Sequence, residues 1–215
     1  METDVQKKEE KGVALLNSLY QFVINGVPPL SEPVEELAGY YKTRYPDNCE
    51  TAIEKFILNQ KLKCSTTGFI TGLGGLLTLP ITLPADLASS LYMELRMIAG
   101  IAYIRGYDLK DDAVKTLLYL CLVGNAVGDV IKQVGIKISG QYTLKKLLPR
   151  LSKEIIVKIN KAVGFRLVTK AGSKGIINVA KLIPLLGGIV SATFNWFEVA
   201  FYARIAKRMF EENNI

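Results

Sequence analysis

The sequence predicts an all-α fold: a compact helical domain with a central glycine-rich apolar hairpin and amphipathic basic helices. Apolar residues recur every three or four positions along most of the 215 residues, which is the spacing of one helix face. Capping residues, glycines and prolines stand at the ends of these stretches. Only Leu76 to Leu83 alternates as a strand would, so we expect no sheet of useful size.

Two helices are expected in the first part of the chain. Asp4 to Val23 has the pattern of an amphipathic helix, and Gly26 followed by Pro28-Pro29 ends it. The Ser-Glu-Pro sequence at residues 31–33 marks the start of a second helix, which ends near Tyr45-Pro46.

The middle of the chain predicts two longer helices. The first follows Asp47 or Asn48, either of which is a good N-cap residue. Pro84 favours the first turn of a long helix that runs to about Arg105, and Gly106 ends that helix.

The rest of the chain is also helical in pattern. Asp108, with Asp111 three residues later, resembles a capping box and predicts a helix that continues to about Ile138. Further helices are expected over Gln141–Leu148, Ser152–Val163, Ser173–Leu182 and from about Pro184 to Phe210. We divide the chain into an N-terminal helical extension, residues 1–47, and a helical domain, residues 48–215.

Composition excludes several classes of protein. Hydrophobic residues make up 49% of the chain, which is too many for a disordered protein. The chain has no histidine, so a Ser-His-Asp or Cys-His catalytic centre and a histidine-ligated zinc site are excluded. We therefore expect no metal and no cofactor, and the sequence indicates no enzyme class.

Cysteine usage and the N-terminal residues indicate the compartment. Cys49, Cys64 and Cys121 are odd in number and form no CxxC motif, as expected for reduced thiols in a cytosol. Cys64 and Cys121 have apolar neighbours and are expected to be buried. The first residues lack the apolar run of a secretory signal. The expected location is cytoplasmic, peripheral to the inner face of the membrane.

Cys64 to Ala85 is a run of 22 residues without charge. A membrane-spanning helix needs about 20 apolar residues, but this run contains four glycines together with Pro80 and Pro84. Three interpretations stay open: a single transmembrane helix, a buried core hairpin, and a hairpin that docks on or partly enters a membrane. The candidate membrane contacts are Phe69, Ile70, Leu73, Leu76, Leu77, Leu79, Ile81 and Leu83.

The positive charge is concentrated in one zone. Between Ile131 and Lys181 the chain has twelve Lys and Arg residues and a single acid, Glu154, whereas the whole chain has a net charge of +7. Basic residues interleaved with apolar ones are typical of membrane-surface helices. The alternatives are a solvated helix face and a nucleic-acid site, but the zone has only two aromatic residues for stacking, so no nucleic acid is expected. The candidate anionic-surface contacts are Lys145, Lys146, Arg150, Lys153, Lys158, Lys161, Arg166 and Lys170.

Three charged residues, Glu94, Arg96 and Glu198, stand in apolar helices without an opposite charge one turn away. Because an isolated buried ion is very costly, such charges must pair between helices. We expect a polar cluster in which Arg96 or Arg105 faces Glu94 or Glu198. An ion pair that supports the fold is the main interpretation, and a ligand site is the alternative. We name no catalytic residue, because no phosphate-binding loop or metal motif is present.

Two stretches of the chain resemble the EcsC family. They are GFITGLGGLLTLPITLPADLASSLYMELRMIAGIAYIRGYDLKDD, Gly68 to Asp112, and INKAVGFRLVTKAGSKGIINVAKLIPLLGGIVSATFN, Ile159 to Asn195. The likeness extends from about Ala52 to Phe210. The family takes its name from a bacterial protein encoded beside an ABC transporter, so the resemblance implies a bacterial, membrane-associated context and brings no catalytic residues.

These observations lead to one expected function and two alternatives. We expect a non-enzymatic, membrane-associated helical protein that contacts an anionic membrane surface or a membrane complex such as an ABC transporter. Its partners would then be anionic lipids or a membrane protein complex, with oligomerisation left open. The alternatives are a membrane-permeabilising, pore-forming effector that uses the glycine-rich hairpin, and an enzyme that uses the buried carboxylate and arginine cluster.

Overall fold

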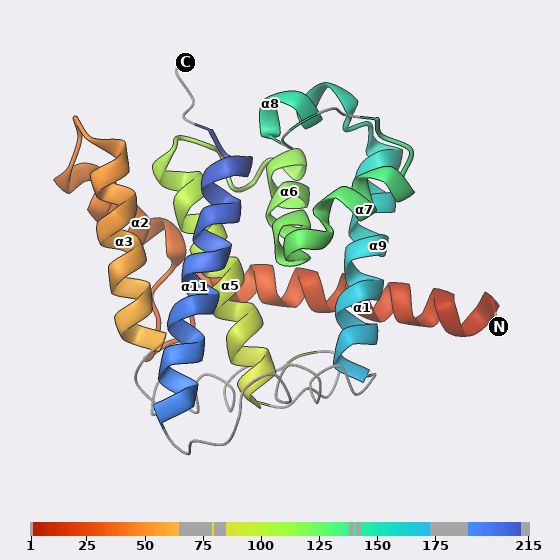
Figure 1. The fold of residues 1–215 in the computed structure, drawn as a ribbon, viewed down its shortest axis with the longest axis horizontal. Helices are drawn as coiled ribbons and strands as arrows, with labels where there is room; N and C mark the ends of the chain where they lie inside the picture. Colours follow the sequence, from red (N-terminus) through yellow and green to blue (C-terminus); the bar gives the residue numbers. More distant parts are fainter. Residues whose placement is uncertain are drawn as a thin grey trace.

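The structure is a computed structural model that describes residues 2–64, 79, 85–137, 140, 143–172 and 189–211. Within these residues every regular secondary-structure element is a helix, which confirms the all-α prediction (Figure 1). The α-helices are α1 (Glu2–Asn25), α2 (Val34–Arg44), α3 (Cys49–Cys64), α5 (Ala85–Ile104), α6 (Asp112–Leu122), α7 (Val127–Gln133), α8 (Leu144–Leu147), α9 (Lys153–Gly172) and α11 (Ile189–Met209). Two short 3₁₀ helices, η1 (Gly124–Ala126) and η2 (Leu148–Arg150), follow α6 and α8.

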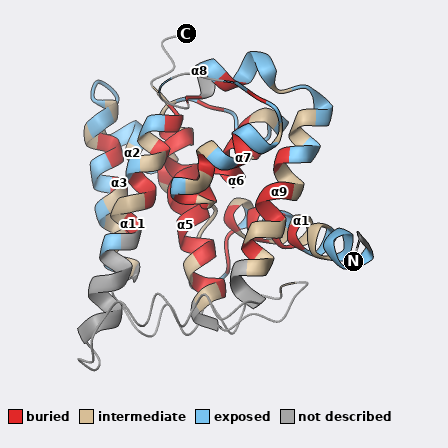
Figure 2. Ribbon diagram, turned by 45° about the vertical axis from the view of Figure 1, so that its right-hand side comes forward, coloured by how far each residue is buried: buried red, intermediate tan, exposed pale blue. Residues whose placement is uncertain are grey.

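Helix α5 is the centre of the fold. It packs against α1, α2, α3, α6 and α11, and its residues from Leu91 to Ala102 are all buried. Figure 2 shows the buried positions gathered on α5 and on the faces of the surrounding helices that turn toward it. A helix buried on all sides is expected to be mostly apolar, and the buried stretch of α5 is apolar except for Glu94 and Arg96.

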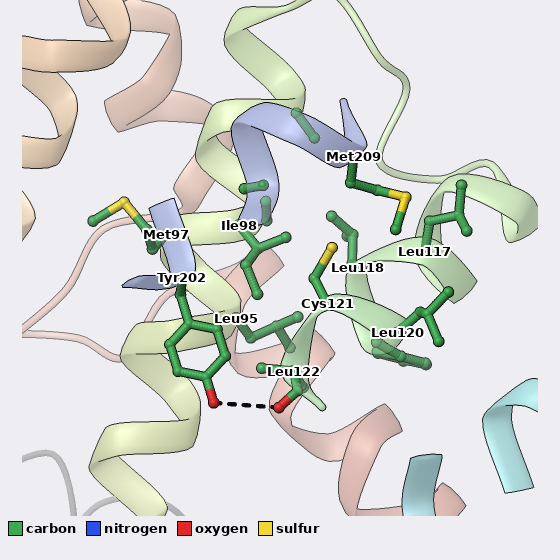
Figure 3. Close-up of a cluster of buried hydrophobic side chains, with 14 of the residues drawn as sticks. Leu95, Met97, Ile98, Leu117, Leu118, Leu120, Cys121, Leu122, Tyr202 and Met209 are labelled. Atoms are coloured by element: carbon green, nitrogen blue, oxygen red, sulfur yellow. Dashed lines mark hydrogen bonds between the residues drawn. The ribbon is translucent and has the colours of Figure 1, made fainter. Parts of the chain in front are cut away.

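One hydrophobic core joins helices that are far apart in the sequence. Leu95 and Ile98 of α5 meet Leu118 and Cys121 of α6, and Tyr202 and Met209 of α11 lie beside them (Figure 3). The hydroxyl of Tyr202 donates a hydrogen bond of 3.3 Å to the carbonyl of Leu122, so its polar end is satisfied within the core. Cys121 is fully buried, as predicted.

The first helices follow the local signals closely. Asn48 caps α3, because its Oδ1 accepts a hydrogen bond of 2.9 Å from the amide of Thr51. Gly106 ends α5 with a φ of 87°, a left-handed conformation that glycine adopts without strain.

The prediction of one long helix from Asp108 to about Ile138 is wrong, because the structure has α6, η1 and α7 over this stretch. Asp111, and not Asp108, is the N-cap, with its carboxylate accepting hydrogen bonds from the amides of Ala113 and Val114. Helix α6 then ends at Leu122, and the chain turns at Gly124, which has a φ of 59° and lies against the ring of Phe201. The packing of α11 on this turn therefore breaks a stretch that looks continuous in the sequence.

Helix α9 is longer than expected, since it continues past Val163 to Gly172. The reason is its crossing with α1, where Gly12 and Gly164 bring the two backbones together (Figure 1). A Cβ atom added at Gly12 would lie 2.2 Å from the carbonyl carbon of Gly164. Gly164 thus allows a close approach between helices and does not end one.

Other expected elements have different outcomes. The helix expected over Gln141–Leu148 is limited, within the described residues, to α8, which η2 follows directly. The helix expected over Ser173–Leu182 and the start of the last helix at Pro184 lie outside the described residues. So does the central glycine-rich hairpin, except for Leu79.

The residues expected to form an N-terminal extension are part of the core. Leu15, Leu16, Leu19 and Val23 of α1 are fully buried. α1 packs against both α9 and α5, and α2 packs against α5. Among the described residues, no helix combines the length and the apolar character that crossing a bilayer requires.

Candidate functional site

Six basic side chains between α7 and the first turns of α9 are exposed. We call them the basic surface: Lys132, Lys137, Lys146, Arg150, Lys153 and Lys158. None of the six takes part in an ion pair within the described part of the chain. The acids Asp129 and Glu154 are exposed in the same stretch, so the basic surface keeps an excess of positive charge.

Local structure fixes the backbone that carries these charges. Pro149 lies in η2, which turns the chain between α8 and α9. Ser152 caps α9, with its Oγ accepting a hydrogen bond of 3.3 Å from the amide of Ile155. Arg150 donates a hydrogen bond of 2.6 Å to the carbonyl of Lys146, one turn earlier. These contacts fix the turn between α8 and α9, where Lys146, Arg150 and Lys153 face solvent.

Two apolar side chains are exposed within the same segment. Leu148 of η2 is 47% exposed and Val157 of α9 is 52% exposed. Each has basic neighbours in sequence, Leu148 between Lys146 and Arg150 and Val157 next to Lys158. Exposed apolar side chains among lysines and arginines are a feature of surfaces that bind at a membrane interface.

The other predicted anionic-surface contacts differ from these. Lys161 pairs with Glu9 of α1 at 3.6 Å, and Arg166 donates to the amide oxygen of Gln133 at 3.5 Å. Their charges are partly used in contacts within the protein. The side chains of Lys145 and Lys170 lie outside the described residues.

The predicted membrane contacts of the hairpin are almost all outside the described residues. Phe69, Ile70, Leu73, Leu76, Leu77, Ile81 and Leu83 belong to this group. Leu79 is described, and it is half-buried and packs against the core.

A second polar site surrounds Arg96, whose side chain on α5 is fully buried. Its Nε donates to Gln60 Oε1 at 3.2 Å, and its Nη1 donates to the Glu32 carbonyl at 2.5 Å and to the Tyr92 hydroxyl at 3.3 Å. The Glu32 carboxylate lies 3.7 Å from Nη2 and pairs with Lys63 at 3.0 Å. Arg96 therefore joins α5 to α3 and to the segment before α2.

These contacts set the protonation of Glu32. Partial burial alone would raise the pKa of its carboxyl group, but several interactions lower it more. They are a hydrogen bond from its own backbone, a hydrogen bond from Lys63, and the charges of Lys63 and Arg96. The resulting pKa lies below the ordinary value of 4.5, so Glu32 is ionised at neutral pH.

A third polar site surrounds Arg105 at the end of α5. Its guanidinium pairs with the Glu50 carboxylate of α3, and Nη1 donates to the carbonyls of Lys207 at 3.2 Å and Phe210 at 2.7 Å. Lys207 also pairs with Glu50, at 2.5 Å. Burial alone would raise the pKa of Glu50, but the hydrogen bonds and charges of Lys207 and Arg105 hold it below 4.5.

Among the described residues, the two arginines have partners other than the predicted ones, and a pair with Glu198 stays a prediction. Arg96 and Arg105 were expected to face Glu94 or Glu198, and they pair with Glu32 and Glu50. Glu94 is buried, and it accepts a hydrogen bond of 3.2 Å from Ser90 on its own helix. The side chain of Glu198 lies outside the described residues.

The two arginines have three partners that were not predicted from the sequence: Glu32, Glu50 and Gln60. Glu32 and Arg96 are 64 residues apart, and Glu50 and Arg105 are 55 apart. No local pattern marks such pairs. The available signal was general: a buried arginine requires a carboxylate from another element.

The helices run between two ends of the molecule, and the Arg105 site lies at the end formed by the C-terminus of α11. α8 lies at the same end as the C-terminus of α11 in both views (Figures 1 and 2). The C-terminal ends of α3 and α9 and the N-terminal ends of α5 and α11 lie at the opposite end. The chain therefore enters residues 65–84 from the end that faces away from α8.

The fold and the basic surface define an all-α protein with a concentrated cationic surface. The model of the EcsC protein family matches residues 41–212, and the chain belongs to this family. No curated protein and no solved structure gives a match to the chain. α1, with its buried leucines, precedes the matched residues but shares their core.

Proposed function

We propose that the protein associates peripherally with an anionic membrane surface, on the inner face of the membrane, through its basic surface. The observation that carries the proposal is the exposure of six lysines and arginines with Leu148 and Val157 among them. Cations that form no ion pair among the described residues remain available for lipid phosphates. The function is binding, and it requires no catalytic group.

The magnitude of the attraction is sufficient for reversible binding. Each lysine or arginine close to an anionic leaflet contributes about 1 kcal/mol. Six such residues, with about 1 kcal/mol from the further burial of each exposed apolar side chain, would total about 8 kcal/mol, which corresponds to a Kd near 1 μM. Salt would weaken this binding strongly, because exposed charges are screened over about 8 Å at physiological ionic strength.

Vesicle co-sedimentation tests the proposal. We expect binding to vesicles of phosphatidylcholine with phosphatidylserine at low salt, and little binding to phosphatidylcholine alone or at high salt. The variant Lys153→Glu/Lys158→Glu should weaken binding at least about tenfold. Each reversal changes the charge by two, so together they lower the positive charge of the basic surface by about four elementary charges. The matched control is Lys7→Glu/Lys11→Glu, which reverses two exposed cations of α1 outside the basic surface.

The apolar contribution needs its own variant. Leu148→Ser/Val157→Ser should reduce binding at high salt more than at low salt, since the apolar contact is not screened. Failure to bind anionic vesicles at low salt would refute lipid binding. Equal losses of affinity in the basic-surface variant and its control would refute the basic surface as the site of contact. The permeabilising alternative rests on residues outside the described ranges. The enzyme alternative rests on a cluster that includes Glu198, whose side chain is also outside them.

A further inference from the structure

A basic groove lies between α3 and α11, away from the basic surface. Its volume is about 500 Å³, and two alanines of α11, Ala200 and Ala203, contribute to its lining. We call it the α3–α11 groove. Its charged lining residues are Lys61, Arg105, Arg204, Lys207, Arg208 and Glu50.

The groove has more positive charge than its own acid can neutralise. Glu50 is the one acid among the described lining residues, and its carboxylate already pairs with both Arg105 and Lys207. Arg204 and Arg208 are exposed and have no ion-pair partner among the described residues. Glu54, the next acid on α3, is exposed and does not line the groove. The lining therefore carries an uncompensated positive charge.

Arg105 supplies a fixed guanidinium at this site. Its side chain is only 8% exposed, and two carbonyls at the end of α11 hold its Nη1. Its Nε is buried and has no hydrogen-bond partner among the described residues. A buried N–H donor without a partner is uncommon in folded proteins, and a water or ligand atom bound beside Arg105 would satisfy it.

The arrangement of the cations favours phosphate groups. Arg204 and Arg208 are one helical turn apart, so their guanidinium groups project from the same face of α11. A guanidinium group can donate two parallel hydrogen bonds to two oxygens of one phosphate. Favourable charge at a helix C-terminus accounts for Lys207 and Arg208 in the last turn, but it does not account for Arg204 in the turn before.

We propose that the α3–α11 groove binds a ligand carrying at least two phosphate groups. One phosphate would contact Arg204 and Arg208, and the second would lie toward Arg105 and Lys207. Such a ligand is either a free polyphosphate compound or the headgroup of a lipid with two phosphates. This proposal is independent of the basic surface, which is formed by other helices.

Isothermal titration with sodium pyrophosphate tests the free ligand. At about 0.15 M salt, where charges separated by more than about 8 Å are screened, we expect saturable binding to one site. Arg204→Glu/Arg208→Glu should weaken it at least about tenfold, as expected when charge-assisted hydrogen bonds are lost. The matched control, Lys7→Glu/Lys11→Glu, again reverses two exposed cations one turn apart and should change the affinity less than about twofold, within the range of exposed charge effects. Glu50→Gln should tighten binding, because it removes the competing carboxylate.

The lipid source has its own arm. Vesicles of phosphatidylcholine with cardiolipin, a lipid with two phosphates, should bind the wild type better than vesicles of equal charge made with phosphatidylserine. This preference should disappear in Arg204→Glu/Arg208→Glu and persist in Lys153→Glu/Lys158→Glu. The proposal is overturned if neither pyrophosphate nor cardiolipin binds in a manner that depends on Arg204 and Arg208, or if the α1 control loses affinity equally. Loss of phosphatidylserine binding alone would bear on the basic surface and leave the groove unaffected.

Discussion

Replacing Gly12 by alanine tests the crossing of α1 and α9. The new Cβ atom would lie 2.2 Å from the carbonyl carbon of Gly164 and 2.3 Å from its oxygen, whereas ordinary contact begins near 3.4 Å. Both atoms belong to the backbone of α9, so no side chain can move aside. The helices would have to separate by about 1.2 Å at this point.

The cost follows from this displacement. Overpacking a well-packed site costs about 1–3 kcal/mol, and a clash between two backbones belongs at the upper end of that range. Alanine is a better helix former than glycine by about 1 kcal/mol, which offsets part of the loss. We expect a net decrease of about 2 kcal/mol in the free energy of unfolding. For a chain of this length the melting temperature should fall by about 4–8 °C.

Thermal unfolding followed by circular dichroism measures the effect, and Gly39→Ala is the matched control. Gly39 also lies within a helix, but a Cβ there would be 3.7 Å from the ring of Tyr103, which is ordinary contact. This control should leave stability unchanged or raise it by up to about 1 kcal/mol. If Gly12→Ala were as stable as the control, the close crossing would be refuted.

Three further predictions concern the polar sites and the core. Arg96→Ala should lower the free energy of unfolding by about 2–4 kcal/mol in urea titrations, because Gln60 and the Glu32 carbonyl lose a buried donor. A decrease below about 0.5 kcal/mol would contradict the hydrogen bonds that Arg96 makes with these two residues. Because Glu32 and Glu50 have lowered pKa values, they contribute stability above their unfolded-state pKa that is lost as the pH falls through the folded-state values. The melting temperature should therefore fall between about pH 5 and pH 3, and less so in Glu32→Gln/Glu50→Gln; parallel curves would argue against the lowered values. Iodoacetamide should label half-exposed Cys49 before Cys121, because burial blocks access to Cys121 and raises the pKa of its thiol. Mass spectrometry of the native protein measures the order, and equal labelling of the two cysteines would contradict it.

The elements that local signals determine could be predicted from the sequence. Asn48 and Gly106 act within a few residues of their own positions, so their roles at the ends of α3 and α5 are visible in the sequence. Glycine inside an apolar stretch has no single meaning. Gly124 ends a helix because its φ is positive, whereas Gly164 continues one because its missing side chain admits α1. Contacts with elements far away in the sequence, Phe201 of α11 for Gly124 and α1 for Gly164, decide between these outcomes.

The same distinction applies to the candidate sites. The basic zone was visible as composition, and four of its eight named residues, Lys146, Arg150, Lys153 and Lys158, are exposed without an ion pair among the described residues. The partners of Arg96 and Arg105 could not be predicted, because they depend on how α3 and the segment before α2 pack on α5. The α3–α11 groove combines cations of α3 and α11 with Arg105, which directly follows α5, so its charge comes from segments far apart in the sequence.

The crossing of α1 and α9 also bears on how the chain folds during synthesis. Gly12 and Gly164 are separated by about 150 residues, which a ribosome adds in about 8–30 s. Until then the apolar face of α1, with Leu15, Leu16 and Leu19, lacks the helix that covers part of it in the native structure. Contacts of this sequence separation form late, because the loop between them must first close. Helix α1 is thus made long before α9 and is among the last of the described helices to reach its final packing.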